Sequence, residues 1–217
     1  MKGFQSHEFD PNCCRDELAE LQSLLRHSAE LGERRDILPF FRKRLHLSAL
    51  LGSYNPRISS YDRVAYEYDV FGDFHCDLAI GDAVRAAYVF VEFEDAGQES
   101  VFVSRGRTTP EWSPRFDHGY SQIIDWLYKL SDMRPSDDFR GRFGSRDASF
   151  TTLLVVGRSG GLAEREQARL RWRQNHVVVD SKHVFCLTFD ELCEDLHFRV
   201  KTYQSASLVA GRQAAQD

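Results

Sequence analysis

Apolar side chains recur along the chain with two different periods, which predict its helices and its strands. Recurrence every three to four residues predicts helices, over 15–31, 34–52, 118–130 and 162–175, with a short one over 190–196. Alternation, or a compact run of β-branched and aromatic residues, predicts strands, over 63–70, 74–80, 86–94, 150–157 and 183–189. The order is therefore two helices, three strands, and then helix and strand in turn up to a last helix.

This order predicts an α/β fold, in which helices pack on a mixed sheet. We expect an N-terminal helical lead-in over 1–54, a domain over 55–200 and a flexible tail over 201–217. The polar, glycine-bearing stretches 97–114 and 135–149 are expected to be loops, where function is often found. Apolar positions of the lead-in either pack on the sheet of the same chain or form an oligomer interface, namely Phe40, Phe41, Leu45 and Leu47.

An acidic pattern lies on two of the predicted strands. Asp77 belongs to the first, and Glu92 and Glu94 end the second, which reads AAYVFVEFE. Alternate residues of a strand point to the same face, so Glu92 and Glu94 should share a face while Asp95 points to the other. If the two strands pair antiparallel, Asp77 lies near Glu92 and supplies a third carboxylate.

Carboxylates at the end of a buried strand need a compensating charge, and a divalent cation supplies one. Oxygen ligands of this kind suit Mg²⁺ or Mn²⁺. The same acids are also compatible with a sheet edge, or with pairing to nearby arginines. His75 and Cys76 flank Asp77, but no second pair of ligands stands at zinc spacing. The five cysteines lack C-x-x-C spacing, which predicts free thiols.

The composition of the chain limits the size of the protein, its possible partners and its location in the cell. A chain of 217 residues with 42% hydrophobic content can form one substantial domain. Its net charge of −5 gives no general attraction to nucleic acid, so any binding must use local basic patches. No apolar run has the length of a membrane span, and the first residues lack the apolar core of a signal peptide. We therefore expect a cytoplasmic protein with no membrane partner.

The order of the elements and the three acids resemble the PD-(D/E)XK nuclease core, a restriction-endonuclease-like fold, here with an N-terminal helical pair. Four motifs resemble the catalytic domain of the Shedu anti-phage defence family, namely VEFEDA at 91–96, SPRFDHGYSQIIDW at 113–126, TTLLVVGR at 151–158 and VFCLTFDEL at 184–192. The sequence ELGERRDILPFFRKRLHLSALLG at 30–52 is similar to the helical lead-in of that family. The resemblance covers about 15–200 and implies a metal-dependent DNA endonuclease of anti-phage defence that forms a homo-oligomer.

The resemblance also implies roles for individual residues. Asp77 and Glu92 match the acidic ligands of Mg²⁺ or Mn²⁺. Glu94 stands where the motif usually has lysine, so it is expected to act as a general base or as an additional metal ligand. Gln122 and Trp126 resemble the Q-x-x-x-Y helix of RecB-like nucleases, and Gln122 is expected to hydrogen-bond a metal-bound water or the substrate backbone. The alternative is a catalytically degenerate nuclease fold that binds nucleic acid or a protein partner.

Basic residues that flank the acidic strand and the central helix are the candidates for DNA contact, namely Arg105, Arg107, Arg115 and His118. A contact with Asp117 at the helix start is the alternative for the histidine. Trp112, in the same loop, either stacks on a base or anchors its own loop.

A basic stripe of Arg165, Arg169 and Arg173 recurs at helical spacing on the 162–175 helix. The stripe either follows a phosphate backbone or is a solvated face that is partly paired with Glu164 and Glu166.

Overall fold

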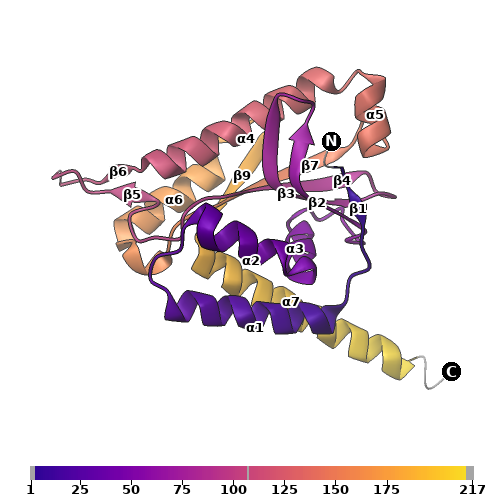
Figure 1. The fold of residues 1–217 in the computed structure, drawn as a ribbon, viewed down its shortest axis with the longest axis horizontal. Coiled ribbons are helices and arrows are strands. Elements are labelled where there is room, and N and C mark those ends of the chain that lie inside the picture. The colour runs from indigo at the N-terminus through magenta and orange to yellow at the C-terminus, as the bar shows by residue number, and fades with distance from the viewer. Residues whose placement is uncertain (1–2, 107, 214–217) are drawn as a thin grey trace.

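A mixed sheet forms the centre of the molecule (Figure 1). The computed structural model describes residues 3–106 and 108–213, and their side chains as far as residue 203. Within these residues seven strands form one sheet in the order β1-β2-β3-β4-β7-β9-β8. Their bounds are β1 Gln5–Ser6, β2 Arg63–Val70, β3 Phe74–Asp82, β4 Ala87–Phe93, β7 Ser149–Val155, β9 Lys182–Leu187 and β8 Val178–Val179. Strands β1 to β4 pair antiparallel, β4, β7 and β9 pair parallel, and β8 returns antiparallel to β9. The predicted mixed α/β class is confirmed.

Helices cover both faces of this sheet (Figure 1). One layer holds α1 Pro11–His27, α2 Leu38–Arg42, α3 Leu45–Leu50 and α7 Phe189–Gln213. The other holds α4 Pro114–Met133, α5 Asp137–Phe143 and α6 Glu164–His176. Strand β4 shows why two layers are needed: Val89, Val91 and Phe93 pack in the core of the first layer, and Tyr88 and Phe90 pack in that of the second. A strand buried on both faces reads as a continuous apolar run.

The lead-in differs from the single helix expected over 34–52. It consists of a π-helical turn at Glu33–Ile37, then α2, α3 and a 3₁₀ turn at Leu51–Tyr54. The chain bends at Arg44, whose φ of −127° and ψ of 75° are not helical. The carboxylate of Glu17 on α1 accepts a hydrogen bond of 2.6 Å from the backbone N–H of Leu47, so a side chain from another helix caps the start of α3. Tertiary contacts of this kind override the local helical pattern.

The apolar lead-in positions pack within the chain. Phe41 and Leu47 are fully buried, Phe40 is nearly so, and Leu45 packs against the same core. Of the two interpretations of these residues, packing on the sheet is the one that the structure supports. They leave little apolar surface for an oligomer interface.

Three segments differ from the expected loops and tail. The stretch 135–149 contains α5, where the Ser136 hydroxyl accepts from the N–H of Phe139 and Gly144 ends the helix with a φ of 78°. The stretch 97–114 contains a small hairpin, β5 Phe102–Val103 and β6 Glu111–Trp112. The short helix expected over 190–196 is α7, which continues to Gln213, so most of the segment expected to be a tail is helical; residues 214–217 lie outside those described. In the described part of the chain, the helices are too short or too polar to cross a membrane.

Candidate functional site

The site forms where β3 and β4 separate. These two strands pair from Asp82–Ala87 as far as Leu78–Val91. Beyond that pair the N–H of Phe93 donates to the Asp77 carboxylate at 2.8 Å, so a side chain replaces the neighbouring strand as acceptor. This hydrogen bond fixes Asp77 at the end of β4, beside Glu92, as the antiparallel pairing predicts.

Glu92 and Glu94 both point toward α4. Glu92 is 6% exposed, and one of its oxygens accepts a hydrogen bond from the side-chain amide of Gln122. Glu94 is 1% exposed and lies against Gly119, where an added Cβ would stand 3.1 Å from its Cγ. Phe93, between them, faces the other layer and stacks on Phe41 with 4.4 Å between ring centroids. The strand alternation predicted from the sequence is therefore present.

Glu33 is a fourth acid of this site, and sequence reasoning missed it. It begins the π-helical turn, and its backbone N–H donates to the Asp95 carboxylate at 2.8 Å. Asp95 thus ties the lead-in to the end of β4. Asp95 lies beyond the last residue of the strand, and Arg115 contacts it as well as Glu94, so the opposite orientation expected for Asp95 does not separate it from the site. The Glu33 carboxylate lies 3.7 Å from Nη1 of Arg115, which is also 3.5 Å from Glu94. The charge of Glu33 raises the pKa of Asp77 and of Glu94. In the sequence it stands in a run of ordinary charges, and no local pattern relates it to residues far along the chain.

The pKa values of the carboxyl groups of Asp77, Glu92 and Glu94 are all raised. Burial, with a smaller contribution from Glu33, raises the pKa of Asp77 to about 7. Burial first and Glu33 second raise the pKa of Glu94 to about 8, although Arg115 opposes the shift. Burial, followed by the charges of Asp77 and Glu94, raises the pKa of Glu92 well above its usual value. Crowded, desolvated acids of this kind favour either a proton or a cation.

Several of these carboxylate oxygens have no hydrogen-bond partner in the described part of the chain. They are Oε2 of Glu92 and both oxygens of Glu94, of which Oε2 makes only an ion pair, at 3.5 Å, with Arg115. Buried polar atoms are seldom left in this state, so each calls for an explanation.

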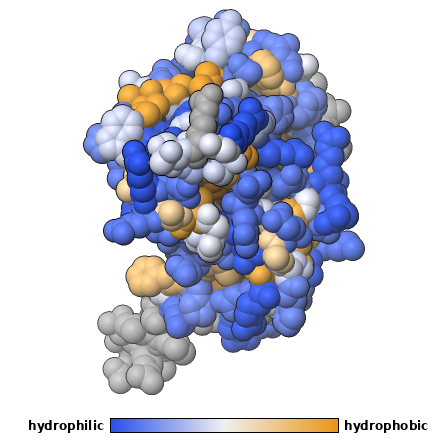
Figure 2. Space-filling model, turned by 90° about the vertical axis from the view of Figure 1, so that its left-hand side faces the viewer, coloured by the Kyte–Doolittle hydropathy of each residue, from blue (hydrophilic) through white to orange (hydrophobic). Residues whose placement is uncertain are grey.

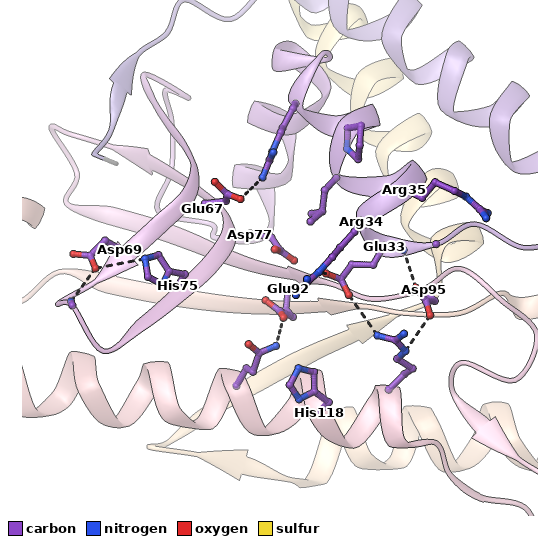
Figure 3. Close-up of a pocket in the computed structure, with 17 residues that line it drawn as sticks. Glu33, Arg34, Arg35, Glu67, Asp69, His75, Asp77, Glu92, Asp95 and His118 are labelled. Atoms are coloured by element: carbon purple, nitrogen blue, oxygen red, sulfur yellow. Dashed lines mark hydrogen bonds and ion pairs between the residues drawn. The ribbon is translucent and has the colours of Figure 1, made fainter. Parts of the chain in front are cut away.

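A cleft of about 1540 Å³ opens over the acids. The lead-in turn, including Glu33, forms one wall, and Arg115, His118 and Gln122 of α4 form the other. Figure 3 shows Asp77 and Glu92 between these walls, with Glu33 and Arg34 reaching in from the lead-in side and His118 standing on α4. The buried Glu94 lies behind this surface.

The four candidates for DNA contact have different positions. Arg115 and His118 line the cleft. Arg105 instead lines a separate hollow of about 650 Å³, together with Asp117 and Arg169. Arg107 lies outside the described residues. The structure therefore brings two of the four to the acidic site.

Arg115 is paired with acids in this conformation. Its Nε lies 3.0 Å from Asp95, and its Nη1 lies 3.5 Å from Glu94 and 3.7 Å from Glu33. The side chain is 52% exposed, so it borders the cleft while it compensates the acids. Pairing of the acids with an arginine, which was one of the alternatives, is thus observed for Glu94.

The donor set can be tested against Mg²⁺ or Mn²⁺. Among the described side chains, no three His, Cys, Asp or Glu residues converge closely enough to form a metal shell as they stand. The donors still fit such an ion by type, because they are carboxylate oxygens, some of them buried and unpartnered. Zinc fits less well, because Cys76 is buried in the core while the His75 side chain is 65% exposed.

The remaining basic and aromatic candidates serve packing. Trp112 stacks on Phe102 and Phe116, with ring centroids 4.3 and 4.4 Å apart, and so anchors its own loop. Arg169 lies over Phe102 at 4.6 Å, and Arg173 lies over the ring of Tyr120 at 4.1 Å. The interpretation of this stripe as a solvated face paired with Glu164 and Glu166 is therefore wrong for these two arginines, because the aromatic cluster attracts their cations.

Fold and site together define a mixed α/β protein with an acidic cleft at the point where two central strands part. The model of the C-terminal region of the Shedu protein SduA matches residues 31–193. The chain belongs to the Shedu family, which acts in anti-phage defence and is associated with nuclease function. A comparison with curated proteins found no match.

Proposed function

We propose that this chain is a metal-dependent DNA endonuclease of anti-phage defence, with a PD-(D/E)XK-like core that hydrolyses phosphodiester bonds. The observation that carries the proposal is the set of acids Asp77, Glu92 and Glu94, gathered where β3 and β4 part, with Glu92 and Glu94 buried and carrying unpartnered oxygens. Keeping such acids ionised without a cation costs free energy, so the position of Asp77 and Glu92 in the cleft, with Glu94 beside them, favours a cation-binding role.

Each acid has a distinct role in this proposal. Asp77 and Glu92 hold Mg²⁺ or Mn²⁺, and Glu94 acts as a general base or as a further ligand. When bound, the ion neutralises charge on the phosphate and lowers the pKa of a bound water. Gln122 orients Glu92 through its amide hydrogen bond, which leaves the other carboxylate oxygen free to bind.

Substrate DNA is proposed to lie between the lead-in and α4. Arg115 and His118 face this space from α4. Arg34 faces it from the lead-in, and its side chain is 93% exposed. Cations at both rims allow a phosphate backbone to approach an acidic floor, in a chain whose net charge of −5 would otherwise repel it.

A second candidate function is a catalytically degenerate nuclease fold that binds nucleic acid or a protein. The ion pair between Arg115 and Glu94 favours it, because an arginine already compensates the acid that stands in the usual lysine position. Metal binding distinguishes the two functions, since a degenerate site has no need of the ion.

The test is cleavage of supercoiled plasmid by the purified protein in Mg²⁺ or Mn²⁺, with EDTA as the blank. Asp77→Asn and Glu92→Gln keep the shape of the side chains, and Asp125→Asn, on the exposed face of α4, is the matched control. The nuclease proposal expects metal-dependent cleavage by the wild type and the control, reduced at least about 10²-fold in the two site variants. Cleavage that persists in both site variants would contradict it.

We further propose that the protein acts in the cytoplasm and as a homo-oligomer. The support for oligomerisation is the family resemblance. Light scattering at working concentration tests it, and a strict monomer would contradict it.

A further inference from the structure

Arg115 joins three acids from two parts of the chain, Glu33 of the lead-in and the neighbouring residues Glu94 and Asp95 at the end of β4. Its closest contact is Nε to Asp95 at 3.0 Å. The contacts of Nη1 with Glu94, at 3.5 Å, and with Glu33, at 3.7 Å, are longer. The guanidinium therefore has one tight anchor on Asp95 and a looser end that faces the site acids.

The Nη1 end of the Arg115 guanidinium supplies positive charge beside Glu94 and Glu33. Glu94 is 1% exposed, and among the described residues its carboxylate forms an ion pair with Arg115. A divalent cation drawn to Glu94 or Glu33 would be repelled by a guanidinium at these distances. Arg115 and the metal therefore compete for the same carboxylates.

The position of Arg115 lets its looser end move. It lies in the first turn of α4, and its side chain is about half exposed. It lines both the acidic cleft and a neighbouring hollow of about 780 Å³, as does His118. Rotation about the Asp95 anchor would carry the Nη atoms away from the acids and toward open space, where a substrate phosphate would find them. Arginine suits such an exchange, because its planar fork matches both carboxylate and phosphate.

We propose that Arg115 acts as an exchangeable counter-ion: it neutralises Glu94 and Glu33 in the metal-free protein, and it turns to the substrate phosphate once a metal ion is bound by the acids. The inference rests on the proposed function, because it assumes that the acids bind a metal.

Calorimetric titration of Mn²⁺ into the full chain tests this role. Arg115→Gln should bind Mn²⁺ about tenfold more tightly than the wild type, because the competing cation is gone. Arg115→Lys, which keeps the charge, should stay within about threefold of the wild type. The matched control is Arg171→Gln, because Arg171 is an exposed residue of α6 that does not line the cleft, and it should change the affinity by less than about twofold.

Plasmid cleavage at saturating Mn²⁺ separates this role from a purely structural one. Arg115→Gln should cleave more slowly although it holds the metal more tightly, whereas loss of a structural contact would weaken both properties. Affinity in Arg115→Gln that is equal to or below that of the wild type overturns the inference. If the wild type itself binds no Mn²⁺, the proposed function fails, and the two failures are thus distinct.

Nuclear magnetic resonance of the wild type tests the inference even if Arg115→Gln does not fold. The guanidinium N–H signal of Arg115, assigned by its loss in Arg115→Lys, should shift as Mg²⁺ saturates the site. A signal that is unchanged at saturation contradicts the exchange.

Discussion

At the scale of single residues, the site depends on one glycine as much as on its acids. Helix α4 approaches β4 and β7 at Gly119, where an added Cβ would meet Leu154 Cδ1 at 2.6 Å and Glu94 Oε1 at 3.3 Å. The missing side chain leaves the space that the Glu94 side chain occupies. Gly119 thus links helix packing to the position of an acid.

Gly119→Ala should therefore displace Glu94 and destabilise the fold by about 1–3 kcal/mol, the usual cost of overpacking. Gly141→Ala is the control, because Gly141 lies in α5 with no atom near its added Cβ. That change should stabilise the protein by about 0.5–1 kcal/mol through helix propensity. Urea unfolding measures both values, and equal effects of the two substitutions would show that Gly119 has no special packing role.

The acids also give the metal-free protein a characteristic pH dependence. The pKa of Asp77 rises from 3.8 to about 7 on folding, and that of Glu94 from 4.5 to about 8. Between about pH 4 and pH 8 the folded chain therefore binds more protons than the unfolded chain, so the free energy of unfolding falls as the pH rises through this window.

Thermal unfolding in EDTA should thus give a lower midpoint at pH 8 than at pH 5.5. Asp77→Asn should lessen this difference and stabilise the protein by about 2 kcal/mol at pH 8, because the amide carries no charge and still accepts from Phe93. A midpoint that rises with pH, or a slope unaffected by Asp77→Asn, would contradict the assignment of these buried acids.

At the scale of elements, the lead-in is part of the site. Its π-helical turn supplies Glu33, and Asp95 holds that turn against the end of β4. Behind the turn, Phe41 of α2 stacks on Phe93, which stands between the two glutamates of β4. Packing beneath the sheet therefore supports the acids above it.

Phe41→Ala should cost about 3–5 kcal/mol of stability, because a fully buried aromatic side chain leaves a cavity. Phe198→Ala removes the same group from a position that is 71% exposed, and should cost less than about 0.5 kcal/mol. Urea denaturation compares the two variants. A small effect at Phe41 would mean that the lead-in does not support β4.

The features of these elements that can be predicted from the sequence are those determined by residues close together in the chain. Strand 63–70 has the predicted bounds, and the alternation at the end of β4 places Glu92 and Glu94 on one face, because a strand repeats every two residues. Helix α5 also had a local signal, in Ser136 and Gly144, but its polar sequence concealed it. Glu33 and the bend at Arg44 had none, because contacts with Asp95 and Glu17 from distant segments determine them.

At the scale of the whole molecule, the face that carries β5 and β6 is mainly hydrophilic. Figure 2, which views the end that carries β5 and β6, shows small apolar patches separated by polar side chains. Large apolar residues that are exposed on the outer helices include Ile124 and Tyr128 of α4 and Trp172 of α6. The apolar lead-in residues Phe40, Phe41 and Leu47 are buried. A homo-oligomer would therefore form through surfaces other than these residues.

Binding of a divalent ion by Asp77 of β3 and Glu92 of β4 is the central claim, and anomalous scattering from crystals grown with Mn²⁺ tests it most directly. We predict an anomalous peak within coordination distance of Asp77 and Glu92, about 2.0–2.2 Å from their oxygens as for comparable small divalent ions, that is lost in Glu92→Gln. A map with no peak between these two carboxylates at saturating Mn²⁺ would contradict the claim.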